Sequence, residues 1–505
     1  MTVVRCVILT ITSGLAFSLA AKEAKYPWRG YMLDVSRHFF RVSDVKKTLV
    51  QMSRCHLNVF HFHLTDNRGW RLEIDKYPNL TKEGATCSTR RLRVSTMDRS
   101  THEGTYGPYF YTKAQMRDII DTAKRLGIEV VPEIEIPGHS LEVARAYPQF
   151  VCAGLKSSPD LCVGSDAVMK FYEDVLDEVC ELFPGKFIHI GGDECQMKNW
   201  KACADCQARK AKHALKDEIE LHYWYMRHFC EYLEKKGRRA VLWGDVMRAR
   251  KHLPKSAVIM AYNGVWYGKL ALRAGHEVVF CPAPCYFDYS QDLEGDRQEY
   301  QPFGGKFSAV GLRTFDPALL VEADIRSGIL GSQGCMWTEL VPDFAGVEWR
   351  TWPRLAALAY VLKNGPVEDE GAFREMLEKK RAELLSDGVN AAPLGPLTVD
   401  QRSRLVPPPR IYRKKGGLSK LLDCPLDRRI IEWDATKLGD RYRRIYAKKD
   451  PALPSGGYRL FLQPKMIRLE VSDDAGIERA LTALRQMQRP KMDGTMEFDG
   501  CEIED

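Results

Sequence analysis

The chain has 505 residues, which is too long for one typical domain and suits a large domain with a smaller one. Its hydrophobic content of 45% and aromatic content of 10% are enough for a sizeable core. The net charge of +8 is spread over 75 basic and 67 acidic residues without a long block of one sign, so nothing indicates a nucleic-acid partner.

The N-terminal residues predict a signal for export. Arg5 precedes an apolar run from Cys6 to Ala20, and small residues follow that run. This order is typical of a secretory signal peptide, which we place at residues 1–22. The run is short for a membrane-spanning helix, and no later segment is long and apolar enough to span a bilayer. We therefore expect an exported protein, periplasmic or secreted, that does not insert into a membrane.

Short β-rich runs alternate with helical patterns between residues 28 and 339. Strands are predicted at residues 30–36, 58–65, 128–136, 187–192, 240–246, 257–263, 277–284 and 328–337. The helical patterns lie at residues 43–55 with Ser43 as N-cap, 112–127 starting at Thr112 and ending at Gly127, 166–183 and 217–237. Eight strands alternating with helices are typical of an α/β fold, the (β/α)8 TIM barrel. A doubly wound open sheet is the alternative, but no Gly-rich phosphate loop supports it.

The sequence changes character after a helix predicted near residues 367–386, which completes a catalytic barrel domain at residues 25–395. Residues 396–417 are rich in Pro and basic residues, as is typical of a linker. A smaller C-terminal α+β domain is expected at residues 418–505, from strands at residues 428–435, 458–464 and 466–472 and a helix at residues 475–489.

Fifteen cysteines raise the question of bridges or metal. Cys152 and Cys162 are close enough in sequence for a local disulfide in an exported protein. The CADC motif at residues 203–206, with Cys195 upstream and His213 downstream, has a spacing that suggests a structural zinc site without completing it. Disulfides or buried free thiols fit better, so we assign no metal ligand.

Polar and aromatic residues interrupt the apolar runs close to the ends of the predicted strands. Functional residues of such a barrel lie at the C-terminal ends of the strands, where the loops form the pocket. The residues concerned are Arg29, Asp34, Asp66, Glu135, His139, Asp193, Glu194, Trp243, Asp245, Tyr286, Asp288, Trp337 and Glu339. One acid there commonly caps a helix or pairs with an arginine, whereas several acids beside aromatic rings suit a sugar.

Asp193 and Glu194 stand side by side after the fourth predicted strand. The usual glycosidase designs place two carboxyl groups on opposite sides of the anomeric carbon, about 5–5.5 Å apart in retaining enzymes and about 6.5–9.5 Å apart in inverting ones. Adjacent acids suit a design in which the 2-acetamido group of the substrate is the nucleophile. One acid protonates the leaving oxygen, and the other orients the acetamido group and stabilises its positive charge. Such intramolecular attack gains an effective molarity on the order of 10⁵–10⁸ M.

Several motifs resemble those of glycoside hydrolase family 20, the β-N-acetylhexosaminidases. The most specific motif is HIGGDE at residues 189–194. Others match in family order over the barrel, at residues 28–40, 61–74, 132–140, 286–288 and 335–340. The resemblance implies a glycoside hydrolase, and we assign it no cofactor.

The resemblance also implies roles for individual residues. Glu194 is expected to be the general acid and later the base that activates water, while Asp193 orients and stabilises the acetamido group. Tyr286 is expected to form a hydrogen bond with the acetamido oxygen. The other expected site residues are the supporting polar pair Asp66 and His139, the hydroxyl ligands Arg29, Glu339 and Asp288, and the aromatic walls Trp243, Trp337 and Trp266.

The chain departs from the family pattern in three places. Glu135 stands where Asp is usual, and DNRGW at residues 66–70 replaces the commoner DDQGW. Family members usually carry a small α/β domain before the barrel, whereas here residues 456–487 resemble that domain after the barrel. We expect a circular permutation, which would bring Asp505 close to residues 25–29. An unrelated accessory domain is the alternative.

Together these expectations describe an exo-acting, retaining β-N-acetylhexosaminidase that removes terminal β-linked GlcNAc or GalNAc from glycans through an oxazolinium intermediate. Its expected partner is a glycan that ends in an N-acetylhexosamine. The alternatives are a disaccharide-releasing enzyme similar to a lacto-N-biosidase and a non-catalytic glycan-binding protein. Retention of Asp193, Glu194 and Tyr286 argues against the binding protein. The preferred sugar, the linkage and the oligomeric state stay open.

Overall fold

A computed structural model of the chain describes residues 24–89, 104–155, 158–249, 251, 253–291 and 306–395, together with six strand segments between residues 411 and 504. The predicted signal peptide lies outside these residues, as do Asp505, the predicted strand at residues 428–435 and most of the helix expected at residues 475–489. In the described part of the chain, no helix combines the length and the apolar character that crossing a bilayer requires.

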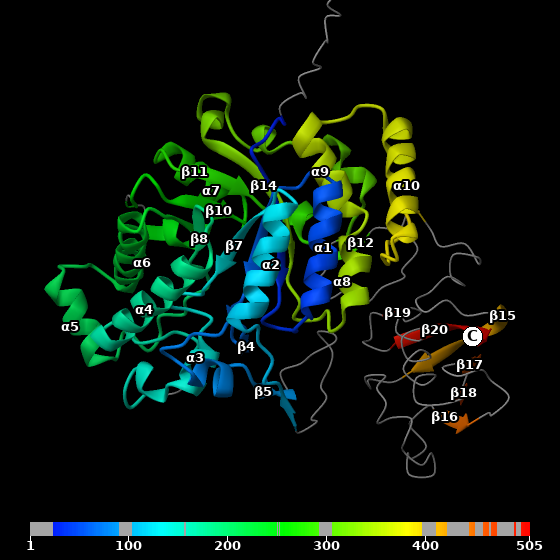
Figure 1. Cartoon of the computed structure of the whole chain (residues 1–505), viewed down its shortest axis with the longest axis horizontal. Helices are drawn as coiled ribbons and strands as arrows, with labels where there is room; N and C mark the ends of the chain where they lie inside the picture. Colours follow the sequence, from blue (N-terminus) through cyan, green and yellow to red (C-terminus); the bar gives the residue numbers. More distant parts are fainter. Residues whose placement is uncertain are drawn as a thin grey trace, which may run out of the picture.

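Eight parallel strands close into a barrel, which confirms the predicted fold class (Figure 1). Around the barrel the strands follow the order β1-β14-β11-β10-β9-β8-β7-β2, so each strand pairs with its neighbour in the chain and the last closes on the first. Their bounds are β1 (Trp28–Asp34), β2 (Val59–His63), β7 (Glu129–Glu133), β8 (Phe187–His189), β9 (Arg239–Trp243), β10 (Val258–Ala261), β11 (Glu277–Phe280) and β14 (Ile329–Met336). All eight coincide with predicted strands.

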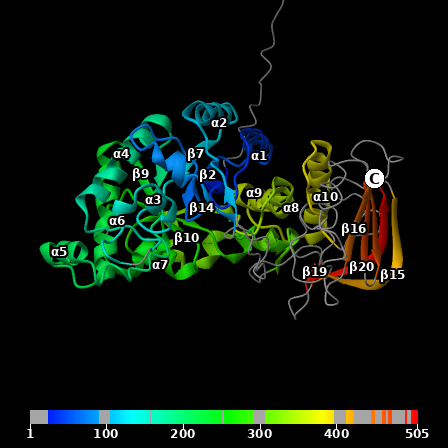
Figure 2. The ribbon, with the colours of Figure 1, turned by 90° about the horizontal axis from the view of Figure 1, so that it is seen from below.

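Helices surround the strands on the outside of the barrel (Figure 2). They are α1 (Val42–Arg54), α2 (Lys113–Arg125), α3 (Leu141–Ala146), α4 (Asp166–Leu182), α5 (Ala204–Lys212), α6 (Glu218–Lys235), α7 (Val265–Arg273), α8 (Phe344–Thr351), α9 (Arg354–Asn364) and α10 (Glu370–Ser386). Short strand pairs lie in the loops: β3 (Thr65–Asp66) with β4 (Gly69–Trp70), β5 (Cys87–Ser88) with β6 (Thr105–Tyr106), and β12 (Ser290–Gln291) with β13 (Lys306–Phe307).

The barrel strands are apolar on both faces because one face packs on the helices and the other fills the barrel. In β9, Ala240 and Leu242 belong to the outer core, whereas Val241 and Trp243 belong to the inner one. This alternation follows from the two-residue period of a strand. Trp243 is the last residue of β9, so its ring lies at the C-terminal end of the barrel interior.

The helix boundaries confirm one predicted cap and correct another. Thr112 caps α2, accepting a hydrogen bond from the Gln115 backbone N–H at 3.2 Å. The N-cap of the first helix lies two residues earlier than predicted: it is Arg41, and its backbone N–H donates to Asp44 at 3.0 Å. Ser43 therefore lies inside the first turn, because Asp44 supplies the capping carboxylate instead of a serine hydroxyl.

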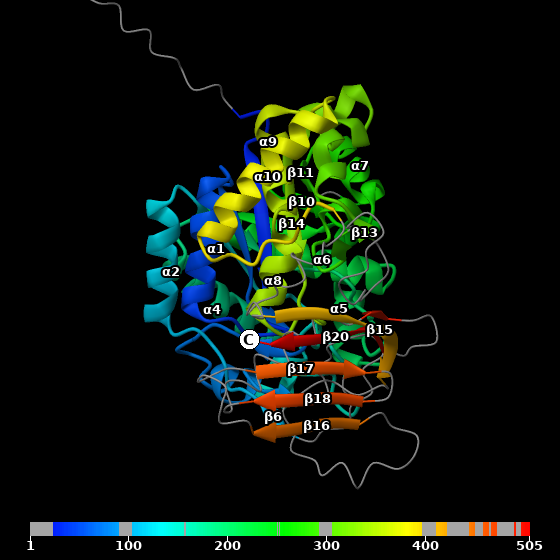
Figure 3. The same cartoon turned by 90° about the vertical axis from the view of Figure 1, so that its right-hand side faces the viewer.

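The C-terminal sheet has the order β15-β20-β17-β18-β16, as Figure 3 shows. Its strands are β15 (Ile411–Leu421), β16 (Arg444–Lys449), β17 (Tyr458–Gln463), β18 (Met466–Val471) and β20 (Met496–Glu504), and β19 (Arg489–Pro490) pairs with β20. Strands β17 and β18 coincide with two predicted strands. The sheet also begins inside the predicted linker, because residues 411–417 belong to β15. The glycines that resembled a loop lie where the β15–β20 register shifts, between Lys414 and Leu418.

Candidate active site

Two glycines and one left-handed non-glycine residue shape the turn that follows β8. Gly191 and Gly192 have φ values of +60° and +95°, and Glu194 follows with φ +47°. A side chain at position 191 would meet the Glu135 carboxylate at 1.9 Å, so this position requires glycine for space as well as for conformation. The turn brings Asp193 and Glu194 to the C-terminal end of the barrel, where the sequence predicts the site.

His139 joins the two acids to a third. Its Nε2 lies 3.4 Å from Asp193 Oδ2 and 3.5 Å from Glu194 Oε2, while its Nδ1 lies 3.5 Å from Asp66 Oδ1. The backbone of His139 is also left-handed, with φ +46°. The predicted residues Asp66, His139, Asp193 and Glu194 therefore form one contiguous group.

The electrostatics of this group favour a charged imidazole. Burial lowers the pKa of His139, but the carboxylates of Asp66 and Asp193 outweigh it and raise that pKa well above the usual histidine range. The contact with His139 in turn lowers the pKa of Glu194, whose side chain is 60% exposed. The free protein thus holds its proton on His139 rather than on Glu194.

A second layer of polar residues lies beneath this group inside the barrel. Glu133 Oε1 accepts from the Trp243 indole N–H at 2.7 Å and lies 2.9 Å from His189 Nδ1. Its Oε2 contacts His61 at 2.9 Å and His63, and His63 Nε2 reaches Asp66 at 3.2 Å. A continuous relay therefore runs from Glu133 through His63 and Asp66 to His139.

Sequence reasoning missed this relay, and it placed Trp243 at the site only as a sugar-facing wall. The histidines of HFH alternate with Phe62 on β2, and His63 is the register partner of Glu133 on β7. Histidine and glutamate atoms here lie within 4.8 Å of one another, a spacing that metal ligands share. Because the Glu133 oxygens already pair with three imidazoles and an indole N–H, the group is explained as a hydrogen-bond network.

Four aromatic rings form a wall beside Asp193. The ring centroids of Trp243 and Tyr262 are 5.0 Å apart, those of Tyr262 and Trp337 5.8 Å, and those of Trp337 and Tyr286 5.4 Å. The Tyr286 hydroxyl donates to the Tyr262 backbone oxygen. The sequence analysis missed Tyr262, because no acidic residue stands beside it. The only signal is an aromatic residue near the end of the predicted strand, directly after what became β10.

A charged cluster occupies another side of the site. Arg37 pairs with Asp66 at 2.5 Å, with Asp34 at 3.2 Å and with Glu339 at 3.3 Å. Asp288 is buried nearby, and burial, with a smaller contribution from Glu339, raises its pKa to about 8. Glu339 Oε2 and Asp288 Oδ1 have no hydrogen-bond partner within the described ranges, so both are available to a ligand.

Arg29 does not belong to the site, which corrects the prediction. It is the second residue of β1 and pairs with Ser332 near the start of β14, whereas Asp34 is the last residue of β1. Its guanidinium donates to the backbone oxygens of His56 at 2.8 Å and Tyr26 at 2.7 Å. The side chain therefore lies at the N-terminal end of the barrel, opposite the acids, and Arg37 supplies the cation at the site.

Trp266 is also separate from the aromatic wall. It lies on the first turn of α7, is 54% exposed, and makes no ring contact with Trp243, Tyr262 or Trp337 among the described residues. The structure thus brings together every predicted site residue except Arg29 and Trp266.

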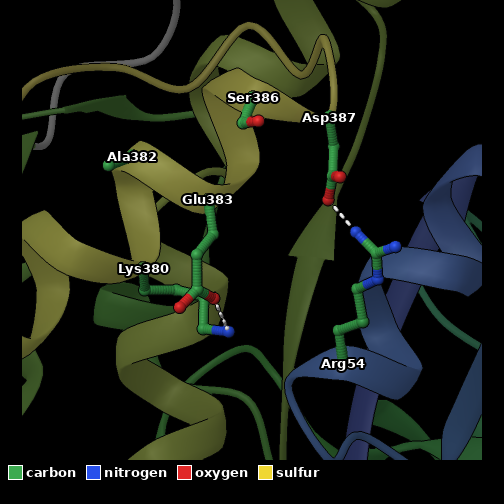
Figure 4. A pocket seen from close by; sticks show the side chains of 6 residues that line it. All are labelled: Arg54, Lys380, Ala382, Glu383, Ser386 and Asp387. Atoms are coloured by element: carbon green, nitrogen blue, oxygen red, sulfur yellow. Dashed lines mark hydrogen bonds and ion pairs between the residues drawn. The ribbon is translucent and has the colours of Figure 1, made fainter.

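A shallow pocket on the flank of the barrel has no role in this site (Figure 4). It lies between the last turns of α1 and α10, where Arg54 pairs with Asp387 and Lys380 with Glu383 at 2.5 Å. Because α1 ends just before β2 begins, the pocket is near the end of the barrel opposite the acids.

Comparisons with known proteins agree with the geometry. The model of the glycosyl hydrolase family 20 catalytic domain matches residues 26–364, and the model of domain 2 of that family matches residues 394–505. Domain 2 therefore follows the barrel, as the sequence predicts. The proximity of Asp505 to residues 25–29 stays a prediction, because Asp505 lies outside the described residues.

Individual relatives are similar over the barrel. The chain is 37% identical over 350 residues to a β-hexosaminidase of Porphyromonas gingivalis, covering 67% of this chain but only 43% of that protein. A β-N-acetylhexosaminidase structure from Bacteroides fragilis has 30% identity and a TM-score of 0.63, covering 74% of each chain.

A third similar protein is a GH20 exo-β-N-acetylglucosaminidase from Vibrio harveyi, in complex with N-acetylglucosamine. The two chains have 28% identity and a TM-score of 0.65, and the match covers 73% of this chain and 59% of the Vibrio chain. Since the catalytic-domain model matches well over half of the chain, the chain belongs to glycosyl hydrolase family 20.

Proposed function

We propose that the protein is an exo-acting, retaining β-N-acetylhexosaminidase that uses the acetamido group of its substrate as the nucleophile. The observation that carries this proposal is the position of Asp193. Its Oδ2 lies 3.4 Å from His139 Nε2, burial together with its charge raises the pKa of Tyr262 in the aromatic wall, and its Oδ1 has no hydrogen-bond partner among the described residues. An acetamide N–H would satisfy that oxygen, and the rings would enclose the methyl group.

The chemistry then divides between the two acids. Glu194 takes the proton that His139 holds in the free protein. The acetamide carbonyl oxygen then attacks the anomeric carbon as the glycosidic C–O bond breaks, and Glu194 gives that proton to the departing oxygen. Asp193 stabilises the positive oxazolinium ring that results. Glu194, now ionised, takes a proton from water, whose oxygen opens the ring and restores the β configuration. Tyr286 would donate to the acetamide oxygen once its hydroxyl turns away from the Tyr262 backbone oxygen, to which it donates in the free protein.

Arg37, Glu339 and Asp288 are proposed to bind the sugar hydroxyls. The guanidinium of Arg37 offers donors, and the unpartnered oxygen of Glu339 is an acceptor. With its pKa raised to about 8, Asp288 is mostly protonated at neutral pH and can donate a hydrogen bond as well as accept one.

A pair of matched variants tests whether Arg37, and not Arg29, is the arginine of the site. Arg37→Lys should lower kcat/KM by about 10–150-fold, because lysine cannot span three carboxylates and a charged hydrogen bond contributes about 1.5–3 kcal/mol. Arg29→Lys should leave kcat/KM within about twofold, because that side chain binds backbone oxygens at the other end of the barrel. Steady-state kinetics measure both. Equal losses in the two variants would contradict the assignment.

Hydrolysis of p-nitrophenyl β-N-acetylglucosaminide tests the function itself. Release of nitrophenol with β-GlcNAc as the first product, seen by NMR, is the expected result. Turnover only of a disaccharide glycoside would favour a lacto-N-biosidase-like enzyme. Binding of N-acetylglucosamine without turnover of any aryl N-acetylhexosaminide would favour a glycan-binding protein.

We also propose that the protein is exported, on the strength of the sequence pattern in residues 1–22. Intact mass of the protein recovered from a secretion-competent host tests this. A mass that retains the N-terminal residues would contradict it.

A further inference from the structure

Four cysteines from two separate segments of the chain meet in one buried cluster. Cys152 and Cys162 come from the loop that follows β7 and α3, whereas Cys203 and Cys206 lie after β8, at the N-cap and in the first turn of α5. Their sulfur atoms all lie within 4.8 Å of one another. Each of the four residues is at most 5% exposed.

The sulfur spacing is that of a tetrahedron around one ion. Cys162 Sγ lies 3.6 Å from Cys203 Sγ and 3.7 Å from Cys206 Sγ, and Cys152 Sγ lies 4.0 Å from Cys206 Sγ. Four thiolates at a Zn–S distance of about 2.3 Å are separated from one another by about 3.8 Å in a regular tetrahedron. We propose that Cys152, Cys162, Cys203 and Cys206 together bind one Zn²⁺ as a structural tetrathiolate site.

The backbone around the cluster is built for this close approach. A Cβ at Gly164 would lie 2.2 Å from the backbone of Asp205 and Cys206, so only glycine lets the Cys162 segment reach the second pair. Cys203 is the N-cap residue of α5, yet its side chain makes no capping hydrogen bond. Its sulfur points to the cluster, and the C-x-x-C spacing presents both sulfurs from one turn, as in zinc knuckles.

The ligand set differs from both expectations drawn from the sequence. Cys152 and Cys162 are free thiols that share the cluster instead of forming a disulfide. Cys195 lies outside the cluster. Its sulfur packs against Gly138 instead, so closely that a Cβ at that glycine would lie 2.9 Å from the sulfur. His213 stacks on Trp224 with ring centroids 4.3 Å apart. The second pair of ligands comes from an earlier loop, which sequence spacing alone does not reveal.

The proposed ion would join the loops that carry the site residues. The same two loops are linked by the Trp200 indole N–H to the Leu161 backbone oxygen at 2.9 Å and by the Met197 N–H to Asp160 at 2.7 Å. His139 lies between β7 and α3, on the segment that leads to the first loop, and Asp193 and Glu194 lie between β8 and α5, on the segment that leads to the second pair of cysteines. A metal crosslink here would hold the imidazole of His139 against Asp193 and Glu194. Loss of the metal should therefore loosen both segments that carry these residues.

Metal analysis of the full-length protein tests the proposal. After dialysis against EDTA, inductively coupled plasma mass spectrometry should find about one zinc per chain, and zinc-edge X-ray absorption should show four sulfur neighbours at about 2.3 Å. Cys203→Ser and Cys206→Ser should lower the zinc content at least about tenfold and lower the Tm. Cys180→Ser, a matched change of a thiol outside the cluster, should keep both values.

Two results would overturn the proposal. One is a folded wild-type protein without zinc. The other is an unreduced, denatured chain whose mass lacks the two hydrogens that each disulfide removes, with the bridges mapped to these cysteines. Should the serine variants fail to fold, the zinc content and absorption spectrum of the wild type decide alone.

Discussion

Asp193→Asn is expected to lower kcat for an aryl β-N-acetylglucosaminide by about 10²–10³-fold, the range for removing one pre-organised contact to a developing charge. The amide keeps the shape of the carboxylate beside His139 and the aromatic wall. It supplies no negative charge to an acetamide that becomes positive as it attacks. Because that charge develops only in the transition state, KM should change little. Initial rates over a range of substrate concentrations measure both constants.

Glu194→Gln is the matched change one residue further on, and the leaving group separates the two variants. Loss of the general acid should cost about 10²–10⁴-fold with a natural glycan and far less with a dinitrophenyl leaving group, which needs no proton. Asp193→Asn should lose activity with both leaving groups, because the acetamide must attack in either case. If Asp193→Asn lowered hydrolysis of the matching β-glucoside by the same factor, catalysis assisted by the acetamide would be contradicted.

The strand and helix pattern of the barrel is readable from sequence because each element carries its own local signal. Thr112 and Gln115 cap α2 reciprocally, and Gly127 ends that helix with φ +71°. The same reasoning failed for the first part of β15, which was predicted as linker, because its basic residues and glycines are not those that strands prefer. There the pairing with β20, a contact distant in sequence, decides the structure.

The direction of the first strand is enough to show that Arg29 cannot belong to the site. Arg29 precedes most of β1 and Arg37 follows it, so the two lie at opposite ends of a strand that rises about 3.3 Å per residue. Only the end that follows a parallel barrel strand carries the site. A family motif containing both arginines does not distinguish them, whereas the direction of the strand does.

Contacts between distant segments are what the sequence could not supply. The relay from Glu133 to His139 depends on the register between β2 and β7, which sets His63 opposite Glu133. The cysteine cluster depends on how two loops fold back over the barrel end, with Gly164 allowing the approach. The CADC spacing alone suggests a metal, and Asp66 and His139 alone suggest a polar pair, but the remaining partners are identified only once the segments are packed together.

Replacing His139 by asparagine should move the basic limb of the kcat/KM profile to lower pH. In the free protein His139 and Glu194 share one proton, held on the imidazole. The limb therefore reports loss of that proton, above the ordinary histidine pKa of about 6.5. Asparagine holds no such proton, so the limb of the variant reports Glu194, a carboxyl with an ordinary pKa of about 4.3.

The sign of the shift separates this role from a merely structural one. The pKa of His139 is higher in the folded protein than in the unfolded chain. Protonated His139 therefore stabilises the fold fully below about pH 6.5, and this stabilisation is lost as the pH rises through the raised pKa. A structural defect would lower activity alike at every pH. Loss of the shared proton should instead cost about 100-fold more at pH 7 than near pH 5, since activity falls about tenfold for each pH unit above the displaced limb.

His56→Asn provides the control for backbone conformation. His56 has φ +61°, close to the φ +46° of His139, and lies just before β2 at the other end of the barrel. Asparagine tolerates left-handed backbone better than most residues, so neither replacement should strain its loop. The pH profile of His56→Asn should match that of the wild type. A His139→Asn profile with an unmoved basic limb would show that Glu194 draws its proton from elsewhere, and the relay through Asp66 would then serve only to position the acids.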